Sequence, residues 1–501
     1  MRTTSTGGTP MNDLAFLSAV ELAAMIQQKK ISSVELLEHY LQRIDRFNPP
    51  INAVVARDDI TARAQAKKAD AALSQGENWG QLHGVPITIK DTFEVVGLPC
   101  TSGAPKLKNH MPAKNAEAVQ SLLNAGAVVM GKTNVPLYGG DIQSVNEVYG
   151  CTNNPWDESR TPGGSSGGAA AALAAGLTSL ELGSDIGGSI RIPAHFCGVY
   201  GHKPSYGIVP DQGHIPPLPG IFTGEHAIQI DIMVSGPLAR SAEDLDLAMT
   251  LITAPEKADQ TAWKIQLPEP RKKKLKEYRI GVWLDDPACP VDCRVGDVLQ
   301  SAVDALSRAG ADIVDKRPEV DLAGSIDIFF NLLSAVMGAG ATPGQFEKWR
   351  KISADLKATD QSYMAKHLRG ATQLHNSWFM QDAMRQILRG KWAEFFKDFD
   401  VLLCPVSPVA AMKHDDRFFY DREIPINDTL RPYQDAMGWA GLVGVVGLPA
   451  TVAPVGITPD GLPIGIQIVG PYLEDRTPIH FARLMQDIVG GFTPPMKYVN
   501  P

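Results

Sequence analysis

Long apolar segments are missing from this sequence, and cysteine is scarce. No uninterrupted run of about 18 apolar residues occurs, so no membrane-spanning helix is expected. The longest apolar candidate, 169–177, is short and rich in alanine, which predicts a buried helix. Six cysteines among 501 residues are too few for a disulfide scaffold. We therefore expect reduced, mostly buried thiols.

The sequence also lacks the patterns typical of metal sites, signal peptides and nucleic-acid-binding surfaces. Cys289 and Cys293 have no second Cys or His pair near them, and no His-Glu-x-x-His motif occurs. Residues 1–10 are polar and lack the apolar core of a signal peptide, which predicts a cytoplasmic protein. The net charge of −8 gives no support to nucleic-acid binding. We accordingly expect no metal, no cofactor, no nucleic-acid partner and no membrane partner.

Strand-like and helical patterns alternate along most of the chain. Strand patterns occur at 51–56, 85–90, 127–130, 177–182, 278–284, 311–315, 401–404, 447–453 and 461–469. Helical patterns begin at the capping box of Ser18 with Glu21 and at Ser33 (running to about Asp45), and recur at 115–125, 295–309, 322–395 and 478–488. This order predicts an α/β fold, a single large domain with a central mixed β-sheet surrounded by helices. The domain is expected over 18–490, between tails at 1–17 and 491–501, with a helical insertion at about 322–395.

One segment matches a phosphate-binding motif in its letters but not in its chemistry. Residues 126–133, Gly-Ala-Val-Val-Met-Gly-Lys-Thr, fit the Walker A pattern. That pattern needs a flexible loop between its glycines, whereas Ala-Val-Val-Met is an apolar run with two β-branched residues. Pro136 also disfavours a helix at the preceding residue. We interpret the segment as the end of a strand without a nucleotide site.

Two glycine-flanked serines lie close together in the sequence, and a lysine precedes them. Ser165 lies in Gly-Gly-Ser-Ser-Gly-Gly at 163–168, Ser189 lies in Gly-Gly-Ser-Ile-Arg at 187–191, and Lys90 ends a strand-like run. Glycine lets the backbone approach a carbonyl group and point N–H groups at a developing oxyanion. A lysine can act as a base when its surroundings lower its pKa from about 10.4. The combination predicts a serine hydrolase that uses lysine rather than histidine.

The first serine also fits the nucleophile elbow of α/β-hydrolases. Residues 163–167 match Gly-x-Ser-x-Gly, and an alanine-rich helix pattern follows. That fold needs a strand before the elbow, whereas 153–162 contains two prolines and no strand pattern. The downstream histidines, at 367, 375, 414 and 480, follow no convincing terminal strand. An α/β-hydrolase-type esterase with Ser165 as nucleophile stays open as the alternative.

The second serine has the better local setting for catalysis. A strand pattern at 180–185 leads into it, and Pro193 suits the first turn of a following helix. Successive backbone N–H groups at 186–189 (Ile186, Gly187, Gly188 and Ser189) could form a nest for an oxyanion. An ordinary strand-to-helix turn would share these features, but the first serine motif and Lys90 favour a catalytic site.

Eight short motifs together resemble the amidase signature family. They lie at 84–91, 131–134, 153–157, 162–168, 183–193, 196–198, 201–204 and 461–467. The resemblance spans roughly 18–490, with the signature core at about 84–204. It implies the amidase signature fold and a Ser–cis-Ser–Lys triad. In that triad Ser189 is the nucleophile, Ser165 is the bridging serine with a cis peptide bond, and Lys90 is the base.

The same resemblance implies roles for residues around the triad. Ile186, Gly187, Gly188 and Gly140 would bind the oxyanion and substrate. Ser166 would help to orient Lys90. Asp185 and Arg191 would brace the turn that carries the nucleophile.

The substrate lies outside what these motifs specify. The segment 135–143 resembles stand-alone bacterial amidases more than amidotransferase subunits, and the chain also resembles members that cleave anilides and carbamates (urethanes). The segments 213–222 and 329–346, which include Met337, predict apolar substrate walls, although ordinary core packing would give the same composition. We expect a free-standing hydrolase of small-molecule amides, with carbamates and esters as further candidates. A protein that resembles the amidotransferase subunits and releases ammonia for a partner is the alternative, and the oligomeric state is open.

Overall fold

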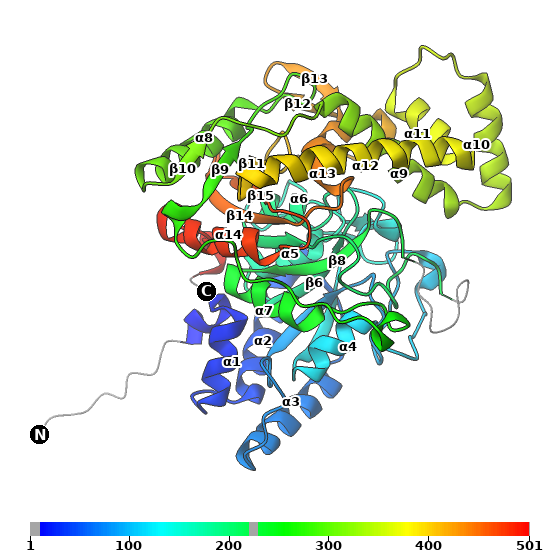
Figure 1. The fold of residues 1–501 in the computed structure, drawn as a ribbon. Helices are drawn as coiled ribbons and strands as arrows, with labels where there is room; N and C mark the ends of the chain where they lie inside the picture. Colours follow the sequence, from blue (N-terminus) through cyan, green and yellow to red (C-terminus); the bar gives the residue numbers. More distant parts are fainter. Residues whose placement is uncertain (1–10, 220–228, 500–501) are drawn as a thin grey trace, which may run out of the picture.

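The structure is a computed structural model, which describes residues 11–219 and 229–499 (Figure 1). These residues form an eleven-stranded sheet in the order β1-β3-β2-β6-β8-β7-β14-β15-β11-β9-β10. Along the chain the strands are β1 (Val54–Arg57), β2 (Pro86–Lys90), β3 (Val128–Thr133), β6 (Leu180–Asp185), β7 (Tyr200–Lys203), β8 (Val234–Ala239), β9 (Arg279–Val282), β10 (Asp312–Val314), β11 (Val401–Pro405), β14 (Ala450–Ile457) and β15 (Pro463–Val469). Two hairpins lie apart from it: β4 (Val145–Asn146) with β5 (Gly150–Cys151), and β12 (Glu423–Ile426) with β13 (Thr429–Pro432).

The sheet is mixed, as the alternation of patterns predicted. Strand β2 runs parallel to β3 and β6, whereas β8, β7, β14 and β15 are joined by antiparallel pairs. The register pairs Ile89 with Leu182, so the carboxyl ends of β2 and β6 lie side by side. This register places Lys90 next to the turn that follows β6.

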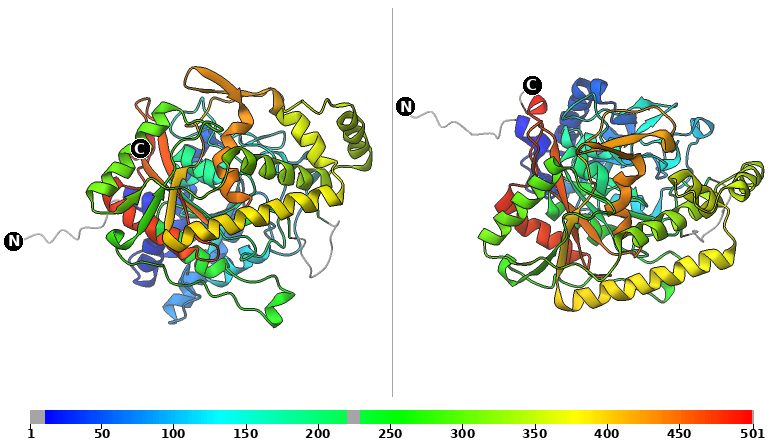
Figure 2. Two further views of the ribbon diagram at one scale, coloured as in Figure 1. Left: turned by 45° about the horizontal axis from the view of Figure 1, so that its top comes forward. Right: turned by 90° about the horizontal axis from the view of Figure 1, so that it is seen from above.

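Helices surround the sheet. They are α1 (Ala19–Gln27), α2 (Ser33–Ile51), α3 (Asp59–Ser74), α4 (Glu117–Asn124), α5 (Gly167–Ala174), α6 (Arg191–Cys197), α7 (Ala242–Ile252), α8 (Cys293–Arg308), α9 (Leu322–Ala339), α10 (Pro343–Asp355), α11 (Tyr363–Ala371), α12 (His375–Asp398), α13 (Gly438–Gly444) and α14 (Arg476–Val489). The helices α1–α3 and the group α9–α12 lie at opposite sides of the molecule in Figure 1, and Figure 2 shows α12 running along its outside. The predicted helical insertion at 322–395 is this second group.

The first two helices begin at capping boxes. Ser18 and Glu21 cap each other, as predicted, and Ser32 with Glu35 does the same for α2. Helix α2 itself begins at Ser33, as expected, and Ser32 is the N-cap before it. The helix also continues past Asp45 to Ile51. Two prolines, at 49–50, lie in its last turn.

The interior is built from the segments that the sequence marked as apolar. All eight residues of α5 are buried, which confirms the buried alanine-rich helix. Gly131, Lys132 and Thr133 lie in β3, so the Walker-like segment is a strand end, as predicted. Five of the six cysteines are buried or half-buried, and all six are free thiols.

Part of each expected tail packs on this core. Met11–Phe16 forms a 3₁₀ helix (η1), and Leu14 and Ala15 are buried. Near the other end, Tyr498 is buried with its ring 5.5 Å from that of Phe47. The packed part of the chain therefore extends beyond 18–490 on both sides, because apolar side chains outside those bounds reach the N-terminal helices. Residues 1–10 and 500–501 lie outside the described residues.

Within residues 11–219 and 229–499, one helix is long and apolar enough to cross a membrane. Helix α9 has 18 residues with a mean hydropathy of 1.6, although Asp327 interrupts its apolar sequence. Half of the helix is buried inside the protein, where it contacts α11, α12 and α13. A core helix passes the same test, so this helix is weak evidence for a membrane span, and it does not overturn the expectation, which concerned an uninterrupted apolar run.

Candidate active site

The side chain of Lys90 is held by two serines at the carboxyl ends of β2 and β6. Its Nζ lies 2.7 Å from Ser165 Oγ, 3.0 Å from Ser184 Oγ and 3.3 Å from the Ser184 carbonyl oxygen. Lys90 is fully buried, and the two serines are at most 5% exposed. The lysine therefore lies in a small polar group inside an apolar core.

The two glycine-flanked serines are brought together by the backbone. Ser165 lies in the loop before α5, and the Gly164–Ser165 peptide bond is cis, as the family resemblance implied. The N–H of Ser166 donates to the carbonyl oxygen of Ser189 over 3.0 Å. Ser189 lies in the turn between β6 and α6 and is 6% exposed. Lys90, Ser165 and Ser189 thus lie in one region, although 75 residues separate the first two in sequence.

Burial changes the chemistry of the lysine. Removal from water disfavours the ammonium form and lowers the pKa of Lys90 to about 7, against the opposing pull of Asp185 and Glu181. Burial also raises the pKa of Glu181 to about 8, so this nearby carboxyl holds its proton near neutral pH. A large share of Lys90 is therefore uncharged at neutral pH, which is the form that a general base needs.

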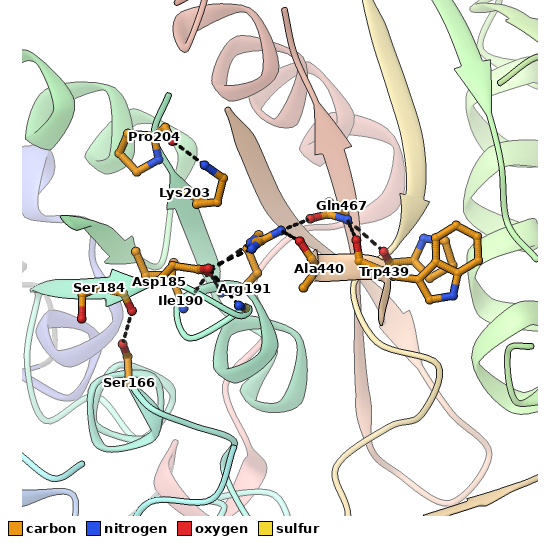
Figure 3. Close-up of polar contacts among 12 residues, drawn as sticks. Ser166, Ser184, Asp185, Ile190, Arg191, Lys203, Pro204, Trp439, Ala440 and Gln467 are labelled. Atoms are coloured by element: carbon orange, nitrogen blue, oxygen red, sulfur yellow. Dashed lines mark hydrogen bonds and ion pairs between the residues drawn. The ribbon is translucent and has the colours of Figure 1, made fainter. Parts of the chain in front are cut away.

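A buried ion pair braces the turn that carries Ser189 (Figure 3). Arg191 donates from Nη2 and Nε to the two carboxylate oxygens of Asp185, over 2.8 and 3.0 Å. Although burial opposes ionisation, the Arg191 guanidinium and backbone N–H donors lower the pKa of Asp185 to about 2. Arg191 Nη1 also donates to Ala440 O and Gln467 Oε1, which ties the turn to α13 and β15. The bracing predicted for Asp185 and Arg191 is what their contacts provide.

Two of the four residues expected to bind the oxyanion and substrate have backbone N–H groups that already donate within the protein. The N–H of Gly188 donates to Asp185 Oδ1 over 2.8 Å, and that of Gly140 donates to Leu137 O over 3.0 Å. These two glycines therefore do not fit the donor role that was expected of them, because their N–H groups are already engaged. Ile186 and Gly187 keep the expected position in the turn next to Ser189.

Gly188 is needed for the shape of the turn. Its φ of +104° lies in the left-handed region, and a Cβ atom there would lie 2.7 Å from Ile192 Cδ1 and 2.9 Å from Ala440 Cβ. The turn can therefore take its shape only with glycine at this position.

Ser166, which was expected to help orient the lysine from outside the triad, does not contact Lys90 directly. Its hydroxyl lies 3.4 Å from the Ser184 carbonyl oxygen, the same atom that Lys90 approaches. Its influence on the lysine therefore passes through that shared acceptor. Besides Ser165, Lys90 contacts Ser184, which sequence reasoning missed even though it adjoins Asp185 in the motif at 183–193.

Two further residues near the triad were not found from the sequence. His214 Nε2 lies 2.9 Å from Ser184 Oγ, and its ring is buried against Phe93. No local pattern marks His214, because a backbone bridge between Phe93 and His214 brings distant segments together. Gly139 is the other: a Cβ atom on it would lie 3.3 Å from Ser165 Oγ. It, rather than Gly140, adjoins the bridging serine.

The histidines of the nucleophile-elbow alternative make their contacts elsewhere. His414 contacts Cys151 and Asn153, and His367 stacks on Tyr420 and meets Trp349 edge-on. His480 is only 3.4 Å from a backbone oxygen, that of Lys273. Ser165 instead contacts Lys90, and β6, the strand expected before an elbow, precedes Ser189. The described geometry favours the lysine-based arrangement.

One expected substrate wall adjoins the turn that carries Ser189. A Cβ atom on Gly187 would lie 3.3 Å from Met437 Sδ and 3.5 Å from Phe329 Cζ, so both apolar side chains pack beside the turn. The segment 329–346 spans the end of helix α9 and the start of α10, and Met337, near the end of α9, is 42% exposed. Of the other wall, 213–222, residues 220–222 lie outside the described residues.

Comparison with known proteins shows which family this chain belongs to. The model of the Amidase family matches residues 35–478. The chain belongs to the amidase family. It is 32% identical to fatty-acid amide hydrolase 2-A of Danio rerio, over 97% of this chain and 91% of that protein. It is 31% identical to the A subunit of the glutamyl-tRNA(Gln) amidotransferase of Methylobacillus flagellatus, over 95% of this chain and 98% of that one.

A solved structure agrees with these relatives. A bacterial aryl acylamidase of the amidase signature enzymes superposes with a TM-score of 0.77 and 26% identity, covering 97% of this chain and 98% of that one. The chain therefore has the amidase signature fold, as the motifs predicted. It is an amidase, a hydrolase that acts on amides.

Proposed function

We propose that this amidase hydrolyses amides through an acyl-enzyme on Ser189, with Ser165 as proton relay and Lys90 as base. The observation that carries the proposal is the fully buried Lys90, whose pKa burial lowers to about 7 and whose Nζ lies 2.7 Å from Ser165 Oγ. A lysine in this state accepts a proton near neutral pH without a histidine.

In the first step Ser189 Oγ bonds to the substrate carbonyl carbon, and its proton passes through Ser165 to Lys90. The tetrahedral intermediate then collapses, the C–N bond breaks, and the leaving nitrogen takes the proton back along the same path. Water repeats the sequence on the acyl-enzyme and releases the acid. Ile186 and Gly187 lie where backbone N–H groups would stabilise the oxyanion.

Labelling with a fluorophosphonate tests the assignment of the nucleophile. Ser189→Ala should abolish labelling and turnover, whereas Ser179→Ala should keep both. Ser179 is a matched control, because it is also fully buried and donates to Pro86 O at the other end of β2. Labelling that survives in Ser189→Ala and disappears in Ser165→Ala would instead favour the nucleophile-elbow alternative.

For the substrate we propose amides with hydrophobic or aryl groups, with carbamates and esters as further substrates because they present a similar carbonyl. Phe329 and Met437 beside Gly187 support an apolar site. The aryl acylamidase and fatty-acid amide hydrolase among the similar proteins point the same way. A panel of anilides, primary amides, esters and carbamates tests this.

Substitutions in helix α9, which carries Phe329 and Met337, sharpen that test. Phe329→Ala should change the ratio of rates on bulky and small amides, because its ring packs beside Gly187. Met337→Ala is the matched control, since Met337 lies on the same helix and is 42% exposed. If Phe329→Ala changes the rates on all substrates by one common factor, the ring has no part in selectivity.

A second candidate is a protein that works as part of an amidotransferase and supplies ammonia to a partner. The 31% identity with an amidotransferase A subunit over nearly the full length supports it. The purified chain distinguishes the two, because a free-standing hydrolase should cleave p-nitroanilides alone. Size-exclusion chromatography of the same sample reports its oligomeric state.

A further inference from the structure

We propose that His214 is a positioning residue that orients the lone pair of Lys90 toward Ser165 by holding the hydroxyl proton of Ser184. The inference rests on the proposed function, in which Lys90 is the base. It concerns a chain of three contacts: His214 to Ser184, Ser184 to Lys90, and Lys90 to Ser165.

The tautomer of His214 follows from its two contacts. Its Nδ1 lies 3.0 Å from Pro216 O, and a carbonyl oxygen can only accept, so Nδ1 carries the hydrogen. Burial lowers the pKa of His214 to about 3, and the ring is therefore neutral. Its Nε2 then has a free lone pair, and the Ser184 hydroxyl, 2.9 Å away, must donate to it.

This bond decides what Ser184 can offer to Lys90. With its proton committed to His214, Ser184 Oγ presents lone pairs alone to Lys90 Nζ at 3.0 Å. The Ser184 carbonyl oxygen, at 3.3 Å, is also an acceptor. A neutral amine has two N–H bonds and one lone pair, so both N–H bonds are taken by Ser184. The lone pair is left for Ser165 Oγ at 2.7 Å.

Proton transfer then needs no rearrangement. Lys90 Nζ takes the proton of Ser165 while Ser165 takes that of Ser189, so one O–H bond breaks for each bond formed. The resulting ammonium donates to the same three oxygen atoms. Without an acceptor at His214, the Ser184 hydroxyl is free to rotate and donate to the Lys90 lone pair, which blocks the base.

The position of the histidine does not depend on its side chain. Glu94 N donates to Gly213 O over 2.8 Å, and Ile215 N donates to Thr92 O over 2.7 Å. These bonds attach the segment around His214 to the segment that directly follows Lys90. A substitution at His214 should therefore change the ring contacts and leave the backbone bridge in place.

The charged groups near this chain of contacts come from neighbouring elements. Asp185 from β6 favours the ammonium form of Lys90, Glu181 from the same strand does so when it is ionised, and Lys90 in turn disfavours the imidazolium of His214. All of them stay in place when His214 is replaced. A shift in the pH profile of a His214 variant can thus be attributed to the Ser184 hydroxyl.

Two substitutions separate this role from simple anchoring of the loop. Gln at 214 can place an amide oxygen near the position of Nε2 and accept from Ser184, but it loses the Nδ1 contact with Pro216. Asn can keep a donor near the Nδ1 position, but it does not reach Ser184. We expect His214→Gln to stay within a few-fold of the parent in kcat. His214→Asn should lose up to about 100-fold in kcat with little change in KM.

The pH profile and a double variant complete the test. In His214→Asn the acid limb of kcat/KM should move to lower pH, because a hydroxyl that donates to the lone pair favours neutral Lys90. In a Ser184→Ala background, the added His214→Asn should change neither kcat nor the profile, since its target is gone. The assay is p-nitroanilide hydrolysis by the purified full chain.

The opposite pattern overturns the proposal. Activity kept in His214→Asn and lost in His214→Gln would mean that the histidine only anchors the loop. Additive effects in the Ser184→Ala background would mean the same. If His214→Asn fails to fold, the pair His214→Gln and Ser184→Ala decides: the first should be active and the second impaired, and the reverse overturns it. Ser189→Ala and Lys90→Met, assayed in parallel, report separately on the proposed function.

Discussion

Two fully buried lysines lie on neighbouring strands, and one of them has a carboxylate within hydrogen-bond distance. Lys132 of β3 is 3.3 Å from Asp91 Oδ1 and donates to Phe93 O over 2.6 Å. Lys90 of β2 has two hydroxyls and a carbonyl oxygen as its hydrogen-bond partners among the described residues. The first lysine compensates a buried carboxylate, whereas the second has no carboxylate within hydrogen-bond distance in the described part of the chain.

The difference shows how one sheet holds a structural cation and a base side by side. A buried ammonium next to a carboxylate keeps its charge at the cost of desolvating both groups. A buried amine without such a partner gives up its proton more easily, and the pKa of Lys90 falls to about 7. The same residue type therefore serves stability on β3 and is suited to catalysis on β2.

The largest effect should come from removing the base. Lys90→Met should lower kcat by at least about 1,000-fold, since general-base catalysis and the orientation of Ser165 are lost together. It should cost little stability, because it removes a buried polar group. Lys132→Met is the matched control, and its folded fraction should keep the kcat of the parent. Comparable loss of kcat in both variants would contradict the division of roles.

The effects on stability should have the reverse order, with Lys132→Met more destabilising than Lys90→Met. Lys132→Met should lower the free energy of unfolding by about 3–5 kcal/mol, because the buried Asp91 loses its cationic partner and, among the described residues, keeps only the Thr101 donors. Burial already raises the pKa of Asp91, against the pull of Lys132. Urea denaturation followed by tryptophan fluorescence measures the change. Adding Asp91→Asn should recover part of the loss, and no recovery would mean that the pair is not what stabilises the site.

The pH dependence of catalysis follows from the lowered pKa of Lys90. The base works when it is neutral, so kcat/KM should be constant well above pH 7 and fall about tenfold for each pH unit below it. The sign is that of a group that must lose a proton before it reacts. A profile that is flat from about pH 5 to pH 8 would exclude Lys90 as the base.

The smallest effect is expected from chelation. Since the proposed base is an amine oriented by hydroxyl groups, dialysis against EDTA should leave the rate unchanged. Among residues 11–219 and 229–499, no group of three or more His, Cys, Asp or Glu side chains could hold a metal ion. A loss of activity that zinc restores would contradict the proposed mechanism.

Local signals were sufficient for much of the fold. The capping box at Ser18, the buried alanine-rich helix α5 and the strand at 128–133 depend on residues close in sequence. Helix α2 was expected to end near Asp45, before the two prolines at 49–50. It instead includes both prolines in its last turn. The segments 11–16 and 496–498 looked like tails because the apolar surfaces that they cover come from distant parts of the chain.

The sequence by itself determined which residues make up the candidate triad, because the glycines around Ser165 and Ser189 and the apolar run before Lys90 are local features. The tertiary structure decided which of these groups are free to act. The N–H of Gly188 is engaged by Asp185, and Ser184 connects Lys90 to His214. Such contacts, and the burial that lowers the pKa of Lys90, arise where distant segments pack, and hydrogen bonding and desolvation depend on every neighbour in space rather than on neighbours in sequence.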